Sequence, residues 1–264
     1  MFKEICESLD KFEKEFIYNS LEIENSGEFS KSAYRFWFND FRKNYLKRTG
    51  DIYEFGVYRG GSLLAIALLS KRLGSKKHIW GFDSFEGFPR FSEQDHLNNF
   101  NEKNGFKKEQ LEDVHLLAKI RQTKNIIEDN LDSSLSKLGK AGLFKNTSYE
   151  FLQEKIEQLS LDNVTLLKGD FKDTVKKHFF EKNRSIFSAN IDCDLYEGYK
   201  LCLPIVFESL EIGGIINLDE YYSLKYPGAK IATDEFLSVN SAAFLIKSNT
   251  RKGEFPRYQI QKKE

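Results

Sequence analysis

The sequence lacks several features that would place it in a particular class of protein. Among its 264 residues, Lys plus Arg and Asp plus Glu number 40 each, so no excess charge favours nucleic acid or an anionic membrane as a partner. No stretch approaches about 18 uninterrupted apolar residues, so we expect no membrane-spanning helix. The three cysteines form no C-x-x-C pair, and free thiols in a reducing compartment are the simplest interpretation. The N-terminal residues carry several acids and no apolar core, so we expect no signal peptide and a cytoplasmic location.

The dinucleotide fingerprint G-x-G-x-x-G is also missing, and a different glycine loop is present. The segment DIYEFGVYRGGS (51–62) predicts a strand, a loop with the spacing G-x-x-x-G-G, and a helix from Ser62 to Arg72. Glycines let the backbone approach a ligand, and a helix N-terminus offers free amide donors. This loop suits a cofactor without a pyrophosphate, although a purely structural strand-to-helix turn would also explain it. The candidate cofactor residues here are Glu54, Gly56, Tyr58, Arg59, Gly60 and Ser62.

Two further strand ends carry candidate cofactor residues. The segment KHIWGFD (77–83) predicts a second strand ending at Asp83, where an acid could accept hydrogen bonds from ribose hydroxyls, with Ser84 beside it. The alternative is that Asp83 caps the following turn. The segment NVTLLK (163–168) predicts another strand, and Gly169, Asp170 and Phe171 follow it. They could hold an adenine ring, or they could form a polar turn with an aromatic side chain in the core.

Acidic residues follow two more predicted strands. Asp192 and Asp194 come after the apolar run 185–191, and Asp219 and Glu220 come after the run 215–218. Parallel neighbouring strands would bring these acids together at their carboxyl ends. Carboxylates at such short distances repel one another unless a cation lies between them. Their oxygen atoms are ligands that suit Mg, Ca or Mn. The alternative is that the acids only cap turns.

The remaining segments are harder to assign. Residues 1–49 indicate amphipathic helices and an aromatic stretch, which could pack on the core, cover a substrate as a lid, or form a contact in a homo-oligomer. Residues 90–147 exceed an ordinary crossover and indicate an inserted lid. His178 is expected at the surface. We place the substrate beside four aromatic residues, Tyr34, Trp37, Tyr221 and Tyr222.

Taken together, the motifs resemble those of the macrocin O-methyltransferase family. They are YEFGVYRGGSL, GFDSFEGFP, LLKGDFKDTV, IDCDLYEGY and GGIINLDEYYSLKYPGAKIATDEF, in the family's order, over about residues 50–240. The resemblance implies a class I methyltransferase fold for residues 50–264: a seven-stranded, mostly parallel sheet with an antiparallel last strand and helices on both faces. It also implies S-adenosylmethionine and Mg as cofactors, and transfer of a methyl group to a sugar hydroxyl.

The resemblance further implies roles for individual acids. Asp192, Asp219 and Glu220 would bind the metal, and Asp192 would also act as the catalytic base. The family has a second aspartate where this chain has Glu220, and a glycine where it has Cys193. The acceptor would be a small molecule containing a sugar: a nucleotide-linked sugar, a surface glycan or a glycosylated natural product. The rival interpretations are an NAD(P)-dependent oxidoreductase and a non-catalytic cofactor-binding subunit.

Overall fold

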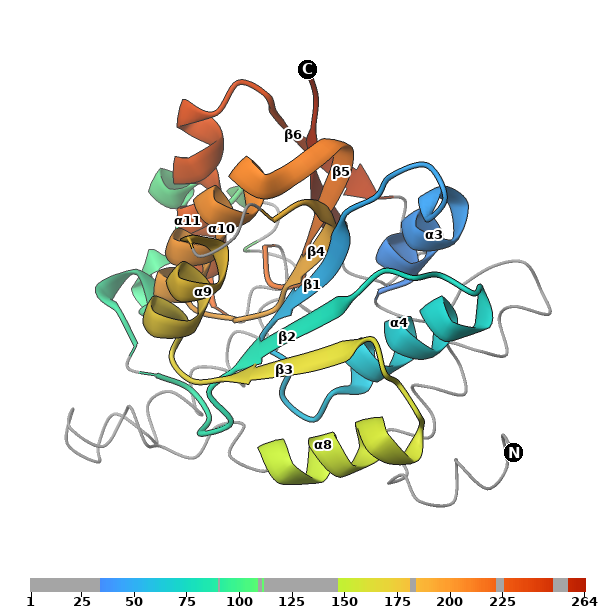
Figure 1. Ribbon diagram of the computed structural model, residues 1–264. Coiled ribbons are helices and arrows are strands. Elements are labelled where there is room, and N and C mark those ends of the chain that lie inside the picture. The colour runs from blue at the N-terminus through green and yellow to red at the C-terminus, as the bar shows by residue number, and fades with distance from the viewer. Residues whose placement is uncertain are drawn as a thin grey trace.

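A single mixed sheet organises the part of the chain that the structure describes. The computed structural model describes residues 34–89, 91–108, 111, 147–180, 184–221, 226–248 and 256–264. The strand order is β3-β2-β1-β4-β5-β7-β6 (Figure 1). The strands are β1 (Asp51–Phe55), β2 (Ile79–Asp83), β3 (Val164–Lys168), β4 (Ile186–Ile191), β5 (Leu210–Leu218), β6 (Ala243–Ser248) and β7 (Arg257–Lys262). Strands β1 to β5 pair in parallel, and β7 lies antiparallel between β5 and β6.

Helices cover both faces of this sheet. They are α3 (Arg35–Asn44), α4 (Gly61–Arg72), α8 (Tyr149–Gln158), α9 (Phe171–Phe180), α10 (Tyr196–Ser209) and α11 (Pro227–Val239). Helices α3, α4 and α8 lie on one face, and α9, α10 and α11 lie on the other (Figure 1). Each set buries its own apolar cluster against the sheet. This arrangement confirms the predicted fold class.

Burial along the strands follows from this layering. All six residues of β4 are buried, as expected for a central parallel strand covered on both faces. The helix α4 is buried at nine of its positions, which explains its nearly continuous apolar sequence. Strand β6, by contrast, lies at the edge of the sheet and exposes Phe244 and Ile246.

The described part of the segment after β2 is held against α10 and α11. It contains three short 3₁₀ helices, at Glu93–Asp95, Leu97–Asn99 and Glu102–Asn104. Asp95 is 1% exposed, and its Oδ1 accepts a hydrogen bond of 2.9 Å from the backbone amide of Tyr196 at the start of α10. A Cβ atom on Gly228 would lie 2.0 Å from that same oxygen. Glycine at 228 therefore allows this segment to approach α11.

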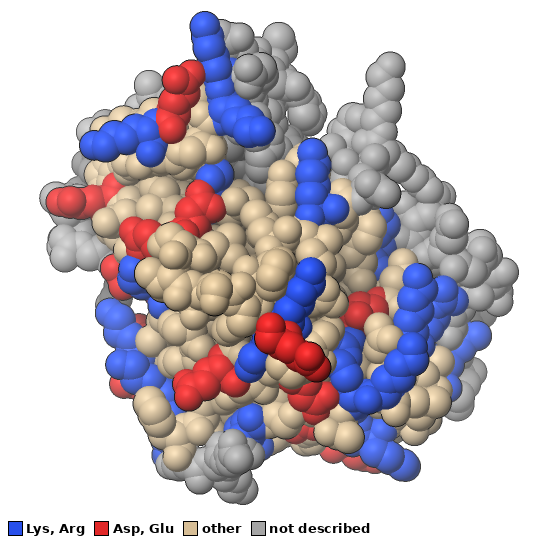
Figure 2. All heavy atoms as spheres, turned by 90° about the horizontal axis from the view of Figure 1, so that it is seen from above, with Lys and Arg blue, Asp and Glu red and all other residues tan. Residues whose placement is uncertain are grey.

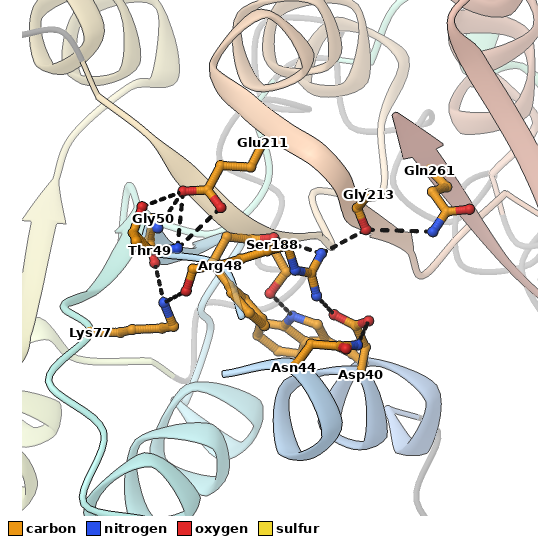
Figure 3. A network of polar contacts seen from close by, with 12 residues as sticks. Asp40, Asn44, Arg48, Thr49, Gly50, Lys77, Ser188, Glu211, Gly213 and Gln261 are labelled. Carbon is orange, nitrogen blue, oxygen red and sulfur yellow. Dashed lines mark hydrogen bonds and ion pairs between the residues drawn. The ribbon is translucent and has the colours of Figure 1, made fainter. Parts of the chain in front are cut away.

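A polar network ties α3 to the amino-terminal edge of the sheet (Figure 3). Arg48 pairs with Asp40 of α3 and donates to the carbonyl of Gly213 at 2.7 Å. The carboxylate of Glu211 accepts from the amides of Thr49 and Gly50. These contacts join the segment after α3 to strand β5. They lie at the end of the sheet opposite the acidic residues that follow β4 and β5.

Charges of both signs are interspersed on the face seen from above (Figure 2). Lys and Arg side chains lie beside Asp and Glu side chains over much of the described surface in this view. None of the described helices is both long and apolar enough to cross a membrane.

Most predicted elements agree with the structure. Helix α4 ends at Arg72 and is followed by Gly74 with φ of +64°, as expected for a helix stop. Strand β5 begins at Leu210, earlier than the predicted run 215–218. The surface prediction for His178 was wrong, because this residue is 8% exposed and its ring packs edge-to-face on Phe82. The proposed lids fall largely on residues 1–33 and 112–146, which lie outside the described residues.

Candidate active site

The glycine loop after β1 passes directly over the end of β4. A Cβ atom on Gly56 would lie 2.0 Å from the carbonyl oxygen of Asp192, and its φ is +90°. Only glycine tolerates both conditions. Gly60 has a φ of +81° and is the N-cap of α4, and a Cβ there would meet Leu152 of α8. The loop is therefore pressed between β4 and α8, and Arg59 within it is half-buried.

Asp83 fixes the shape of this loop from the neighbouring strand. Its Oδ2 accepts a hydrogen bond of 2.8 Å from the amide of Tyr58, which has a left-handed φ of 52°. Its Oδ1 accepts from the amide of Phe85 at 2.7 Å. Burial raises the pKa of Asp83, and these backbone donors oppose that rise. Ser84 accepts from the amide of Glu86 and so stabilises the turn. Asp83 has the predicted turn-capping role, and its contact with a ribose remains a prediction.

Glu54 is a fully buried acid at the end of β1. Its Oε1 accepts hydrogen bonds from the hydroxyl of Ser62 and from the amide of Asn190, the latter at 2.8 Å. Its Oε2 has no hydrogen-bond partner in the described structure. Burial raises the pKa of Glu54 to about 8, and Asp219 and Asp83 also raise it. The side chain is therefore available to ionise when a cationic group approaches.

The loop after β3 is the third predicted part of the cofactor site. Gly169 donates its amide to the carbonyl of Asp83 at 3.0 Å and has a φ of 143°. Asp170 is exposed and caps α9 by accepting from the amide of Lys172 at 2.8 Å. Phe171 packs edge-to-face on Phe55. These contacts match the predicted polar turn, and an adenine contact remains a prediction.

Three carboxylates gather where β4 and β5 end. Oxygen atoms of Asp192, Asp194 and Glu220 lie within 4.8 Å of one another. Asp194 is 8% exposed and Glu220 is 1% exposed. Burial raises the pKa of Asp192 well above its usual range, and the charges of Asp219 and Asp194 add to that rise. A carboxylate is costly in such surroundings unless a cation compensates it.

Asp219 lies at the same edge but turns towards a different partner. Its Oδ1 is 3.0 Å from Nη1 of Arg257 on β7. The resemblance implies that Asp219 binds the metal with Asp192 and Glu220, whereas the carboxylates that gather within reach of one ion are those of Asp192, Asp194 and Glu220. The reason is the antiparallel strand β7, which brings a guanidinium beside Asp219. Nothing in the sequence around Arg257 indicated this contact.

The donor set fits a divalent cation. Mg²⁺ binds oxygens at about 2.0–2.1 Å and Ca²⁺ at about 2.3–2.6 Å, so opposite ligands lie about 4–5 Å apart. One oxygen of each of the three carboxylates lies within 4.8 Å of the others, close enough for all three to contact one ion. Asp192, Asp194 and Glu220 are thus the residues that would hold the ion.

The predicted substrate aromatics divide into different environments. The hydroxyl of Tyr34 donates a hydrogen bond of 2.6 Å to Oδ2 of Asp192, so this residue does lie at the acidic cluster. Trp37 was placed wrongly: it is 0% exposed, and its ring nitrogen donates to Ser188 of β4 at 2.9 Å. Trp37 lies on the face of α3 that is buried against the sheet, together with Phe38 and Phe41. Tyr221 is 7% exposed and donates to Asp234, and Tyr222 lies outside the described residues.

This strand order, with β7 reversed between β5 and β6, defines a class I, Rossmann-like methyltransferase fold. Solved structures agree at the level of the fold. An O-methyltransferase called NovP superposes with a TM-score of 0.56 at 22% identity, covering 86% of this chain and 76% of its own. The calicheamicin methyltransferase CalS11 superposes with a TM-score of 0.59 at 20% identity, covering 96% and 93%.

The chain belongs to the macrocin O-methyltransferase (TylF) family, whose model matches residues 47–163 and 148–247. A mycinamicin III 3''-O-methyltransferase of Micromonospora griseorubida is 25% identical over 79% of this chain and 68% of its own. A tetracenomycin-related rhamnosyl 4'-O-methyltransferase of Streptomyces olivaceus is 26% identical over 65% and 53%. The matches therefore span about half to two thirds of the length of these curated relatives.

Proposed function

We propose that this protein methylates a hydroxyl group of a sugar, using S-adenosylmethionine as the methyl donor and a divalent cation, Mg²⁺, at the acidic cluster. The observation that carries the proposal is the position of Asp192. Its carbonyl lies against Gly56 of the glycine loop, while its carboxylate belongs to the acidic cluster. One residue therefore borders both the predicted cofactor loop and the predicted metal site.

The residues of the glycine loop would bind and orient the methyl donor. Glu54 provides a carboxyl that can ionise next to the positive charge of the cofactor, and the start of α4 offers backbone donors. Asp83 would face the ribose hydroxyls while keeping Tyr58 in its left-handed conformation. Holding the donor in line with the acceptor lowers the barrier mainly through positioning.

A sugar hydroxyl is a weak nucleophile at neutral pH because it remains protonated. A bound Mg²⁺ would supply Lewis acidity that lowers the pKa of the hydroxyl. Asp192 would accept its proton, because its carboxylate belongs to the cluster that would hold both the ion and the hydroxyl. Tyr34 would hold the Asp192 side chain in place through its hydroxyl.

The acceptor class rests on the relatives. One is named for 4'-O-methyl transfer on a rhamnosyl tetracenomycin, and another for 3''-O-methyl transfer on mycinamicin III. We propose that this chain also methylates the sugar of a glycosylated natural product. A nucleotide-linked sugar and a surface glycan are the alternative acceptors.

The deciding experiment has two stages. Titration calorimetry should detect binding of S-adenosylhomocysteine but not of NAD. Methyl transfer to a panel of nucleotide-linked sugars and glycosylated small molecules should then be lost in EDTA and restored by Mg²⁺. Tight binding of NAD without binding of S-adenosylhomocysteine would contradict the proposal and support the oxidoreductase alternative. Binding without transfer and without metal affinity would support a non-catalytic subunit.

A further inference from the structure

A line of buried polar side chains crosses three neighbouring strands beneath the candidate active site. Glu54 of β1 is in register with Asn190 of β4, and Asn190 is in register with Asn217 of β5. Their exposed fractions are 0%, 0% and 3%. Side chains two residues apart on a strand share a face, so Asp192 and Asp219 lie on this same face at the edge of the sheet.

The hydrogen bonds along this line all run in the same direction, from β5 through β4 to β1. Asn217 donates its amide to Oδ1 of Asn190 at 2.7 Å, and Asn190 donates its own amide to Oε1 of Glu54 at 2.8 Å. A carboxylate only accepts hydrogen bonds, so Glu54 requires the amide nitrogen of Asn190 to face it. That orientation leaves the oxygen of Asn190 facing Asn217, which supplies the matching donor.

The line ends on an unused acceptor. Ser62 and Asn190 both bond to Oε1 of Glu54, whereas Oε2 is buried and has no partner in the described structure. A row of buried polar groups destabilises the fold relative to an apolar core unless every group has a hydrogen-bond partner or the group without a partner binds a ligand. The open acceptor belongs to the residue beside the glycine loop.

We propose that Asn190 is a positioning residue for cofactor binding: its amide, oriented by Asn217, holds Glu54 so that the free carboxylate oxygen receives a cationic group of the cofactor. This inference rests on the proposed function, because it takes S-adenosylmethionine and its product as the ligands. Both carry an ammonium group that a carboxylate can bind. Asn190 acts through Glu54 and need not touch the ligand.

Ionisation of Glu54 is then linked to binding. Among the described residues, the titratable side chains that bear electrostatically on Glu54 include Asp219, Asp83 and Tyr34. Burial and the two aspartates raise the pKa of Glu54 to about 8, while the hydrogen bond from Asn190 lowers it. Since the ionised form binds the cation, affinity should rise as the pH approaches the pKa of Glu54.

The test measures binding of S-adenosylhomocysteine by calorimetry, without metal, over about pH 6 to 9, a range around the pKa of Glu54. Removing the donor in Asn190→Leu should move the rise in affinity upward by about one pH unit and weaken binding at pH 7 about tenfold. The matched control is Ser188→Ala, which breaks another buried hydrogen bond on the same strand and face. It should lower the melting temperature and leave the pH profile in place.

Each outcome bears on one proposal. If the wild type binds no S-adenosylhomocysteine at any pH, the proposed function fails. If the wild type binds and both variants keep its pH profile, Asn190 is only structural and the inference is overturned. Should Asn190→Leu not fold, Asn190→Ser, whose hydroxyl is too short to reach Glu54, takes its place with the same expectations.

Discussion

Asp194 and Asp219 offer a direct comparison, because they flank the same site and only one belongs to the gathered carboxylates. Asp194 lies within 4.8 Å of Asp192 and Glu220, whereas Asp219 is paired with Arg257. We predict that Asp194→Asn weakens divalent metal binding far more than Asp219→Asn does. Both changes preserve the size of the side chain and remove one negative charge.

The expected magnitudes follow from the contacts. Loss of residues that merely support metal ligands costs about 10–100-fold in affinity, so loss of a direct ligand should reach at least about 100-fold, or about 2.7 kcal/mol. In Asp219→Asn the amide oxygen can still accept from Arg257, so metal affinity should change less than about tenfold. This variant should instead lose about 1 kcal/mol of folding free energy, because a partly buried charged hydrogen bond becomes a neutral one.

Titration calorimetry with Mg²⁺ or Mn²⁺ measures the affinities, and urea unfolding measures the stabilities. Melting curves of both variants first establish that they are folded. The reasoning is refuted if Asp219→Asn abolishes metal binding while Asp194→Asn retains it. That result would restore the set Asp192, Asp219 and Glu220.

Three further predictions concern stability and substrate handling. Trp37→Phe should lower the free energy of unfolding by about 1–3 kcal/mol, because the hydrogen bond to Ser188 and part of the packing are lost. Urea unfolding measures this change, and a larger effect on acceptor KM than on stability would contradict the core placement of Trp37. Burial opposes ionisation of Glu211, but the hydrogen bonds that its carboxylate accepts outweigh burial and lower its pKa. The ionised side chain therefore stabilises the fold at pH values above the pKa of Glu211 in the unfolded chain, and this stabilisation is lost as the pH falls through its pKa in the folded protein. Glu211→Gln should therefore be about 1–2 kcal/mol less stable at pH 7 and match the wild type in acid; a gap that persists in acid would refute this. Tyr34→Phe should lower kcat about tenfold and change the affinity for S-adenosylhomocysteine much less, because its hydroxyl donates a hydrogen bond to the proposed base, Asp192. Initial rates and calorimetry measure the two effects, and equal losses in both would show a general disruption.

The sheet could be predicted from the sequence because its signals are local. Each parallel strand is a short apolar run that ends at glycine or an acid, and the loop at Gly56 marks the passage into α4. Such patterns depend on neighbouring residues only. The acids at the ends of β4 and β5 could likewise be placed at one edge, since parallel strands end together.

The partners of the individual acids could not be predicted, because they come from distant parts of the chain. Asp219 is satisfied by Arg257, which lies 38 residues later and reaches it only through the antiparallel pairing of β7. Asp192 accepts from Tyr34, which is 158 residues earlier. The inward direction of Trp37 depends on the packing of α3 against β4, whose Ser188 accepts its hydrogen bond from 151 residues along the chain.

The position of β7 has a consequence for the order of assembly during synthesis. Ribosomes deliver β5 first, then β6, and β7 last, yet β7 occupies the place between them. Until Arg257–Lys262 has emerged, β6 has no neighbour in the described sheet with which to pair, and Asp219 has no guanidinium beside it. The pairing of β6 and the contact between Arg257 and Asp219 therefore form only after translation has passed β7.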